Sequence, residues 1–164
     1  MELPAVKSSH NQIVLIPGSK DPYKRWPKES FIDLAKELQK HHSVVIVGNK
    51  EEQPLCEEIA RESNATAKND LSLRELINFL ASAPLVISND TGPMHIAFAT
   101  KTKTIALFSA TDSKRYGPYH IESAKVLEQR QACTPCLRRK CADNFCMQQI
   151  APQTVAYEAL KWLQ

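Results

Sequence analysis

The sequence predicts an α/β domain, in which a Rossmann-like parallel sheet carries helices on both faces. Three short apolar runs, at 13–16, 44–47 and 85–87, each stop at a polar or glycine-containing turn. Such runs are typical of strands that a parallel sheet buries on both faces. Between them lie segments of helical length with helical spacing of apolar residues. Strands that alternate with helices in this way form βαβ units, whose strands are parallel.

The composition fits one globular domain. The chain has 164 residues, of which 43% are hydrophobic and 24% charged, so it is long enough to bury a core. Its net charge of +3 is too small to make nucleic acid the default partner. It contains no apolar run of the ~18 residues that a membrane span needs, and residues 1–12 carry no signal-peptide core. We therefore expect a cytoplasmic domain that does not bind nucleic acid.

The first half of the chain predicts two strands, a weaker third strand and three helices. After the strand at 13–16, a helix begins near Pro27 and ends at 40–42, because its apolar residues follow the spacing i, i+3, i+4, i+7. The strand at 44–47 stops at Gly48, and a helix over roughly 51–62 follows. A short third strand is expected within 64–71. The next helix begins at a capping box formed by Ser72 and Glu75.

The second half continues the alternation. The strand at 85–87 leads into a helix that Asp90 or Thr91 can cap, with Pro93 in its first turn. A further strand at 104–108 precedes a long polar loop that reaches Tyr119. A short edge strand is expected at 126–127, and the last helix begins at Pro152.

The four glycines of the chain all fall on one side of the predicted sheet. Gly18, Gly48 and Gly92 each come just after a strand, and Gly117 lies in the loop after another. In open parallel sheets, ligands bind outside the carboxyl ends of the strands. The glycine positions therefore predict a binding site at this edge.

The segment from Asp90 to His95 is the strongest candidate for that site. Free backbone N–H groups and the dipole at a helix start attract a phosphate or diphosphate, and Gly92 lets such a ligand approach. His95 lies four residues after Thr91, so both side chains share a helix face. The alternative interpretation is a plain helix cap with a solvated histidine.

A basic loop supplies a second candidate. Lys24 and Arg25 stand beside a predicted helix start, whose dipole their charges oppose. A bound anion would resolve this conflict, but from the pattern alone a solvated loop is equally acceptable. Trp26 is expected to pack beneath the loop, and Cys56 is expected in the core.

These residues carry a family resemblance, which runs from about residue 12 to the end. The chain resembles the C-terminal half of glycosyltransferase family 9, the ADP-heptose:lipopolysaccharide heptosyltransferases. The motifs that carry the resemblance occur in order: Pro17-Gly18-Ser19, Lys24-Arg25-Trp26-Pro27, Ser88-Asn89-Asp90-Thr91-Gly92-Pro93-Met94-His95, Ala106-Leu107-Phe108, Thr111-Asp112, Gly117-Pro118-Tyr119 and Cys133-Thr134-Pro135-Cys136 with Cys141 and Cys146-Met147.

The resemblance implies one half of a GT-B glycosyltransferase, in which this half binds the nucleotide sugar and needs no metal or other cofactor. Lys24 would stabilise the departing diphosphate, together with the residues around it. The nucleoside would lie against the next loops along the sheet edge. The expected diphosphate-binding residues are Ser19, Lys24, Asp90, Thr91, Gly92 and His95, and those of the nucleoside pocket are Asn49, Glu51 and Leu71.

The resemblance also sets the expected domain organisation. Residues 12–164 would form the nucleotide-sugar-binding domain and residues 1–11 the remnant of a linker. The domain that binds the lipopolysaccharide core acceptor and carries the general base would be absent. Asp90 is expected to cap its helix rather than to act as a base. The alternatives are a stand-alone nucleotide-binding module without catalytic activity, and a small zinc-stabilised interaction domain with a basic face.

Four of the five cysteines crowd into one segment. Cys133, Cys136, Cys141 and Cys146 are chemically able to hold zinc, but only one C-x2-C pair is present, so reduced thiols are favoured. A disulfide or redox role stays open. The basic residues 138–140 (Arg138, Arg139 and Lys140) could face the anionic acceptor or the inner face of the membrane, which would make the domain peripheral there.

Overall fold

The core of the fold is a six-stranded parallel sheet. The structure is a computed structural model, which describes residues 11–136, 141 and 143–164. The strand order is β3-β2-β1-β4-β5-β6, and every neighbouring pair is parallel. This is the order of dinucleotide-binding Rossmann folds, so the predicted fold class is confirmed. The strands are β1 (Gln12–Ile16), β2 (Ser43–Val47), β3 (Thr66–Lys68), β4 (Val86–Asn89), β5 (Thr104–Phe108) and β6 (Ala124–Glu128).

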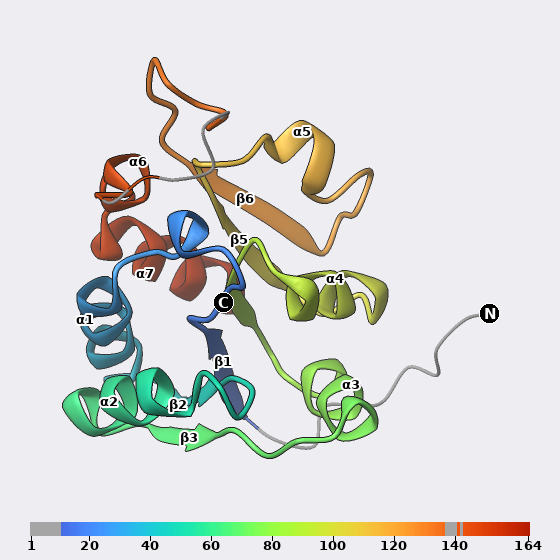
Figure 1. The fold of residues 1–164 in the computed structure, drawn as a ribbon. Coiled ribbons are helices and arrows are strands. Elements are labelled where there is room, and N and C mark those ends of the chain that lie inside the picture. The colour runs from blue at the N-terminus through green and yellow to red at the C-terminus, as the bar shows by residue number, and fades with distance from the viewer. Residues whose placement is uncertain (1–10, 137–140, 142) are drawn as a thin grey trace.

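Helices cover both faces of the sheet (Figure 1). One face packs against α1, α2 and α7, and the other against α3 and α4. The helices are α1 (Lys28–Leu38), α2 (Gln53–Ser63), α3 (Leu73–Ala81), α4 (Gly92–Ala99), α5 (Ser113–Tyr116), α6 (Phe145–Gln148) and α7 (Pro152–Leu163), with a 3-10 turn η1 (Pro22–Lys24).

Strand β1 shows why the predicted runs are continuously apolar. Ile13 and Leu15 point into the core beneath α1 and α7, whereas Val14 and Ile16 point into the core beneath α3 and α4. All four side chains are buried. Because successive side chains of a strand point to opposite faces, every side chain of a strand covered on both faces is buried, which favours a continuous apolar run.

Most of the predicted elements are confirmed, including the third strand, the edge strand and the capping box of Ser72 and Glu75. Two predictions need correction. The loop that follows β5 contains the short helix α5, which the Asp112 side chain caps. The expected capping of α4 is wrong, because Thr91 holds the cap position but neither it nor Asp90 gives a side-chain cap hydrogen bond.

Asn89, at the end of β4, fastens the loop that follows β1. Its side-chain Oδ1 accepts a hydrogen bond from the backbone N–H of Trp26 at 3.1 Å, and its Nδ2 donates to the carbonyl oxygen of Pro17 at 2.8 Å. Asn89 is fully buried. One side chain thus holds both ends of the segment from Pro17 to Trp26, which carries the basic residues. We name these two hydrogen bonds the Asn89 clasp.

Trp26 anchors the far end of that loop, as predicted. Its ring is buried, lies edge-on to Phe31 with the ring centroids 4.9 Å apart, and donates from Nε1 to the carbonyl oxygen of Ile150 at 3.0 Å. The loop therefore joins β4, α1 and the segment before α7. Within the described residues, no helix is both long and apolar enough to cross a bilayer.

We expect Asn89→Ala to lower the free energy of unfolding by about 2–6 kcal/mol. The truncation leaves a buried N–H group and a buried carbonyl without partners, and each such loss costs about 1–3 kcal/mol. Urea denaturation of both proteins measures the difference. Asn78→Ala, at an exposed asparagine of α3, is the matched control and should change stability by less than ~0.5 kcal/mol. Equal stability of Asn89→Ala and the parent would show that the clasp is not structural.

Candidate functional site

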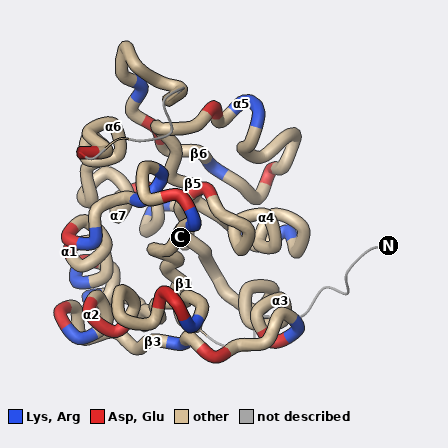
Figure 2. The backbone as a smooth tube through the Cα atoms, in the orientation of Figure 1, with Lys and Arg blue, Asp and Glu red and all other residues tan. Residues whose placement is uncertain are grey.

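The candidate site lies at the carboxyl edge of the sheet, where the loops after β1, β2, β4 and β5 come together (Figure 1). Figure 2 shows that the loops after β1 and β2 carry basic and acidic residues side by side. The glycines there have different roles. A Cβ on Gly18 would lie 2.0 Å from the carboxylate of Glu52, whereas a Cβ on Gly92 would meet nothing within 4 Å. Gly18 therefore makes room for Glu52, and Gly92 borders open space that a ligand can enter.

Lys24 and Asp90 form the charged centre of this edge. The Nζ of Lys24 lies 3.1 Å from Oδ2 of Asp90 and 3.4 Å from Oδ2 of Asp21, and Thr111 donates from Oγ1 to Oδ2 of Asp90 at 2.8 Å. Burial is the largest single effect and would lower the pKa of Lys24, but Asp90, with smaller contributions from Tyr23 and Asp21, outweighs it, so the pKa is raised. Lys24 is thus held as a cation beside the start of α4.

The start of α4 adds a second source of positive potential. The first N–H groups of a helix lack intrahelical partners, and Thr91 does not cap them with its side chain. His95 is exposed one turn further on, with its ring edge-on to Phe98 at a centroid distance of 5.8 Å. The ion pair of Lys24 with Asp90 thus places a cation at a residue that lies two positions before the first residue of α4 in the chain.

Two adjoining cavities extend from α4 toward β3, and Asn49 and Leu71 line both. The inner cavity has about 110 Å³ and is mainly apolar, with Ile16, Val47, Gly48, Asn49, Glu52, Leu71, Leu76, Thr91 and Pro93 as its walls. The outer cavity has about 620 Å³ and is open and polar, lined by Asn49, Lys50, Glu51, Asn69, Asp70, Leu71 and Ser72.

Glu52, and not Glu51, is the acidic residue that faces the inner cavity. Oε2 of Glu52 accepts from the backbone N–H of Asn49 at 3.0 Å, and Oδ1 of Asn49 accepts from the backbone N–H of Glu52 at 2.9 Å. Glu51 is exposed and lines the outer cavity but not the inner one. The Asn-x-x-Glu spacing resembles a capping box, and this signal could have identified Glu52 from the sequence.

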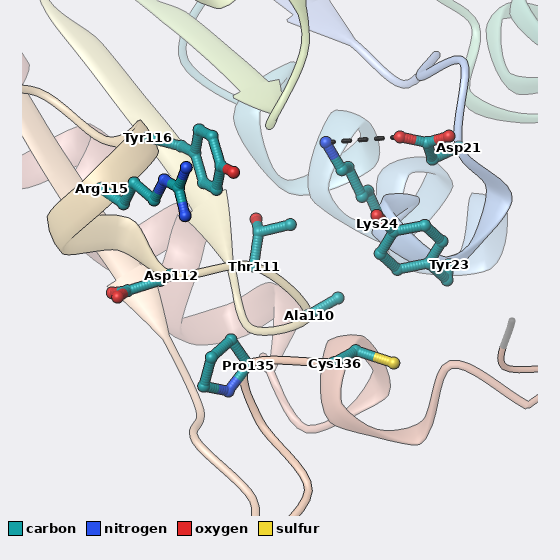
Figure 3. Close-up of a pocket in the computed structure, with 10 residues that line it drawn as sticks. All are labelled: Asp21, Tyr23, Lys24, Ala110, Thr111, Asp112, Arg115, Tyr116, Pro135 and Cys136. Carbon is teal, nitrogen blue, oxygen red and sulfur yellow. Dashed lines mark ion pairs between the residues drawn. The ribbon is translucent and has the colours of Figure 1, made fainter. Parts of the chain in front are cut away.

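A third cavity, of about 350 Å³, lies on the other side of Lys24. In Figure 3, Tyr23 and Lys24 approach it from the loop after β1, and Arg115 and Tyr116 of α5 approach it from across the cavity. The Nζ of Lys24 lies 6.0 Å from the ring centroids of both Tyr23 and Tyr116. No pattern of residues indicated Arg115 and Tyr116, because a four-residue helix is too short to show a period.

The structure brings most of the predicted residues to one edge. Lys24, Asp90, Thr91 and Gly92 lie together, and Asn49 and Leu71 line the cavities beside them. Ser19 is buried, and its hydroxyl donates to the backbone carbonyl of Asp90 at 3.4 Å. Its hydroxyl thus holds the loop in place.

The chain matches the family model of glycosyltransferase family 9 (heptosyltransferase) over residues 2–146. The chain belongs to this family. It is 33% identical over 150 residues to the lipooligosaccharide heptosyltransferase 2 of Campylobacter jejuni serotype O:2, a match that covers 86% of this chain and 47% of that relative. The chain thus spans about half the length of its family 9 relative.

Solved structures of two heptosyltransferases share the fold. The E. coli ADP-heptose lipopolysaccharide heptosyltransferase II superposes with a TM-score of 0.77 at 22% identity, covering 97% of this chain and 48% of that one. The E. coli heptosyltransferase WaaC with ADP gives a TM-score of 0.77 at 20% identity, covering 94% and 45%. The chain covers nearly half of each of these two structures, which agrees with the prediction that it has the fold of one GT-B half.

The cysteines of this family 9 chain differ in exposure. Cys56 is buried, as predicted, and burial raises the pKa of its thiol to about 12. Burial also raises the pKa of Cys146, with the neighbouring thiols adding to the shift, whereas Cys133 and Cys141 are exposed. The described part of the chain contains no group of metal-binding side chains arranged to hold an ion. Arg138, Arg139 and Lys140 lie outside the described residues, as do residues 1–10 of the expected linker.

We expect iodoacetamide at pH 8 to alkylate Cys133 and Cys141 first and to leave Cys56 unmodified in the folded protein. With a pKa of about 12, only about one Cys56 thiol in 10⁴ is a thiolate at that pH. Mass spectrometry of peptides taken over time measures the order, and the same labelling in urea is the control. Labelling of Cys56 in the native protein at the rate of Cys133 would contradict this assignment.

Proposed function

We propose that this chain is the donor-binding half of a glycosyltransferase that transfers heptose from an ADP-heptose-like nucleotide sugar to the lipopolysaccharide inner core. The observation that carries the proposal is the Lys24 cation held by Asp90 beside the uncapped start of α4. Membership of family 9 supports the heptosyl donor, and the C. jejuni relative is a lipooligosaccharide heptosyltransferase. The acceptor and the complete reaction are part of the same proposal.

The diphosphate would bind in the open space beside Gly92. There the first N–H groups of α4 and its dipole favour negative charge, and Lys24 adds a charge-assisted hydrogen bond. On binding, the ammonium group of Lys24 would donate one hydrogen bond to the diphosphate. Asp90 would still accept the hydrogen bond from the hydroxyl of Thr111. Asp90 would thus hold Lys24 in position between binding events.

The nucleoside would extend toward β3. The inner cavity offers Ile16, Val47 and Leu71 as apolar walls, and the carboxylate of Glu52 as an acceptor for ribose hydroxyls. The outer cavity is polar and open, which suits the edge of a nucleobase. We therefore add Glu52 to Asn49, Glu51 and Leu71 as a residue of the nucleoside site.

The sugar would lie on the opposite side of the diphosphate, in the cavity between Lys24 and α5. The lining groups Asp21, Thr111 and Asp112 can hydrogen-bond sugar hydroxyls, and Tyr116 supplies an aromatic face. A nucleotide sugar would thus run along the sheet edge, from the outer cavity across α4 to α5, with its diphosphate at the centre.

Lys24 and the start of α4 would also assist the chemistry. As the bond from the sugar to the diphosphate breaks, negative charge grows on the leaving group, and groups already oriented toward it lower the barrier. This arrangement supplies the stabilisation without a metal. Asp90 is a poor candidate for the general base, because it is engaged by Lys24 and Thr111. We assign the base to the half of the enzyme that this chain does not span.

We expect Lys24→Ala to weaken ADP binding by about 10- to 150-fold. Hydrogen bonds to charged groups are worth about 1.5–3 kcal/mol, and this one would meet the diphosphate directly. Isothermal titration calorimetry with ADP, GDP and UDP measures the effect, and ADP should bind the parent most tightly. Lys24→Arg should not restore the affinity, because the planar guanidinium does not fit the place of an ammonium group.

Two controls sharpen the Lys24 experiment. Lys28→Ala removes an α1 lysine that pairs with Glu58, outside the three cavities, and should leave ADP affinity unchanged. The double variant Lys24→Ala, Asp90→Asn tests whether the unpaired Asp90 carboxylate repels the ligand in the single variant. An unchanged ADP affinity in Lys24→Ala would remove Lys24 from the site, and no binding of any nucleotide to the folded parent would refute the proposed function.

A further inference from the structure

Asn69 carries an unused hydrogen-bond acceptor at the wall of the outer cavity. Asn69 follows β3 directly, and it lines this cavity together with Asn49 and Leu71. Its Oδ1 is buried and accepts no hydrogen bond, and no other buried side-chain nitrogen or oxygen in the described part of the chain lacks a partner. Buried polar atoms are nearly always paired, so an exception at the wall of a cavity indicates a group that a ligand completes.

The other neutral polar side chains of this cavity are already engaged. Oδ1 of Asn49 accepts from the backbone of Glu52, and the hydroxyl of Ser72 donates to Glu75 at 2.5 Å as part of the capping box. The remaining polar residues of the wall, Lys50, Glu51 and Asp70, are exposed and charged. Among the lining residues, Asn69 is thus the neutral side chain with an acceptor to offer.

We propose that Asn69 recognises the nucleobase of the donor and selects adenine; this inference rests on the proposed function, which places the base in the outer cavity. Because Oδ1 is buried, this recognition requires a turn of the amide about its Cβ–Cγ bond that brings both Oδ1 and Nδ2 to the cavity. The amide then accepts from the N6 amino group of adenine and donates to N7, the bidentate pair that asparagine makes with this base. Guanine and hypoxanthine present two acceptors, O6 and N7, on the same edge of the base. With either of them, Oδ1 of Asn69 has no donor to pair with.

Calorimetry with ADP and inosine diphosphate tests this contact, because the two bases differ at C6 and N1, and of these only the group at C6 lies on the edge that Asn69 would read. The parent should bind ADP about 5- to 150-fold more tightly than inosine diphosphate, the discrimination typical of one bidentate pair. Asn69→Ala should lose that preference, while its affinity for inorganic pyrophosphate, which touches only the diphosphate site, stays that of the parent. Asn78→Ala, on the exposed face of α3, should keep the full preference.

The outcomes separate the two proposals. If Asn69→Ala keeps the preference for ADP, or weakens both nucleotides equally, the role of Asn69 is refuted while the proposed function stands. If the parent binds neither nucleotide nor pyrophosphate, the proposed function fails, and the role of Asn69 fails with it. Asn69→Asp covers the case that the alanine variant does not fold. The aspartate keeps an acceptor for the N6 amino group but has no donor for N7, so this variant should retain part of the preference for ADP over inosine diphosphate. A preference as large as that of the parent would count against the proposal.

Discussion

The two hydrogen bonds of the buried Asn89 side chain hold the candidate site together. The loop between Pro17 and Trp26 contains no regular element except the three-residue turn η1, so little in its own backbone fixes its path. Asn89 binds the backbone at both ends of this loop and thereby sets where Lys24 lies relative to Asp90, the next residue of the chain. The amide is neutral and can donate and accept at once, which a carboxylate at this position could not do.

The clasp makes an electrostatic arrangement possible that would otherwise be unfavourable. A lysine near a helix start opposes the dipole, and its partial burial costs solvation. The Asp90 carboxylate, together with Tyr23 and Asp21, offsets the burial and keeps the pKa of Lys24 raised. The result is a cation that stays charged and oriented without a ligand. Preorganised charge of this kind is what a leaving diphosphate requires, since no reorganisation is then needed as the bond breaks.

The sequence predicted the long elements better than the details of the site. Strands such as β1 are buried on both faces, so their apolar runs are unambiguous. The helices α5 and α6 have four residues each, too few to show a period, and the cavity residues Arg115 and Tyr116 were missed for this reason. Glu52 was not among the predicted residues, although the Asn-x-x-Glu spacing signals it; Glu51, which was predicted, lines the outer cavity. The Asn89 clasp was also missed. A pattern of residue types does not show to which backbone groups a buried side-chain amide is hydrogen-bonded.

A crystal structure of this chain with ADP tests most directly whether the clasp builds a diphosphate site. We expect the diphosphate beside Gly92, within hydrogen-bond distance of the first N–H groups of α4 and of Nζ of Lys24. Both hydrogen bonds of Asn89 should be intact in that complex. A structure in which ADP occupies another surface, or in which the diphosphate lies beside Gly92 without contact to Lys24, would contradict it.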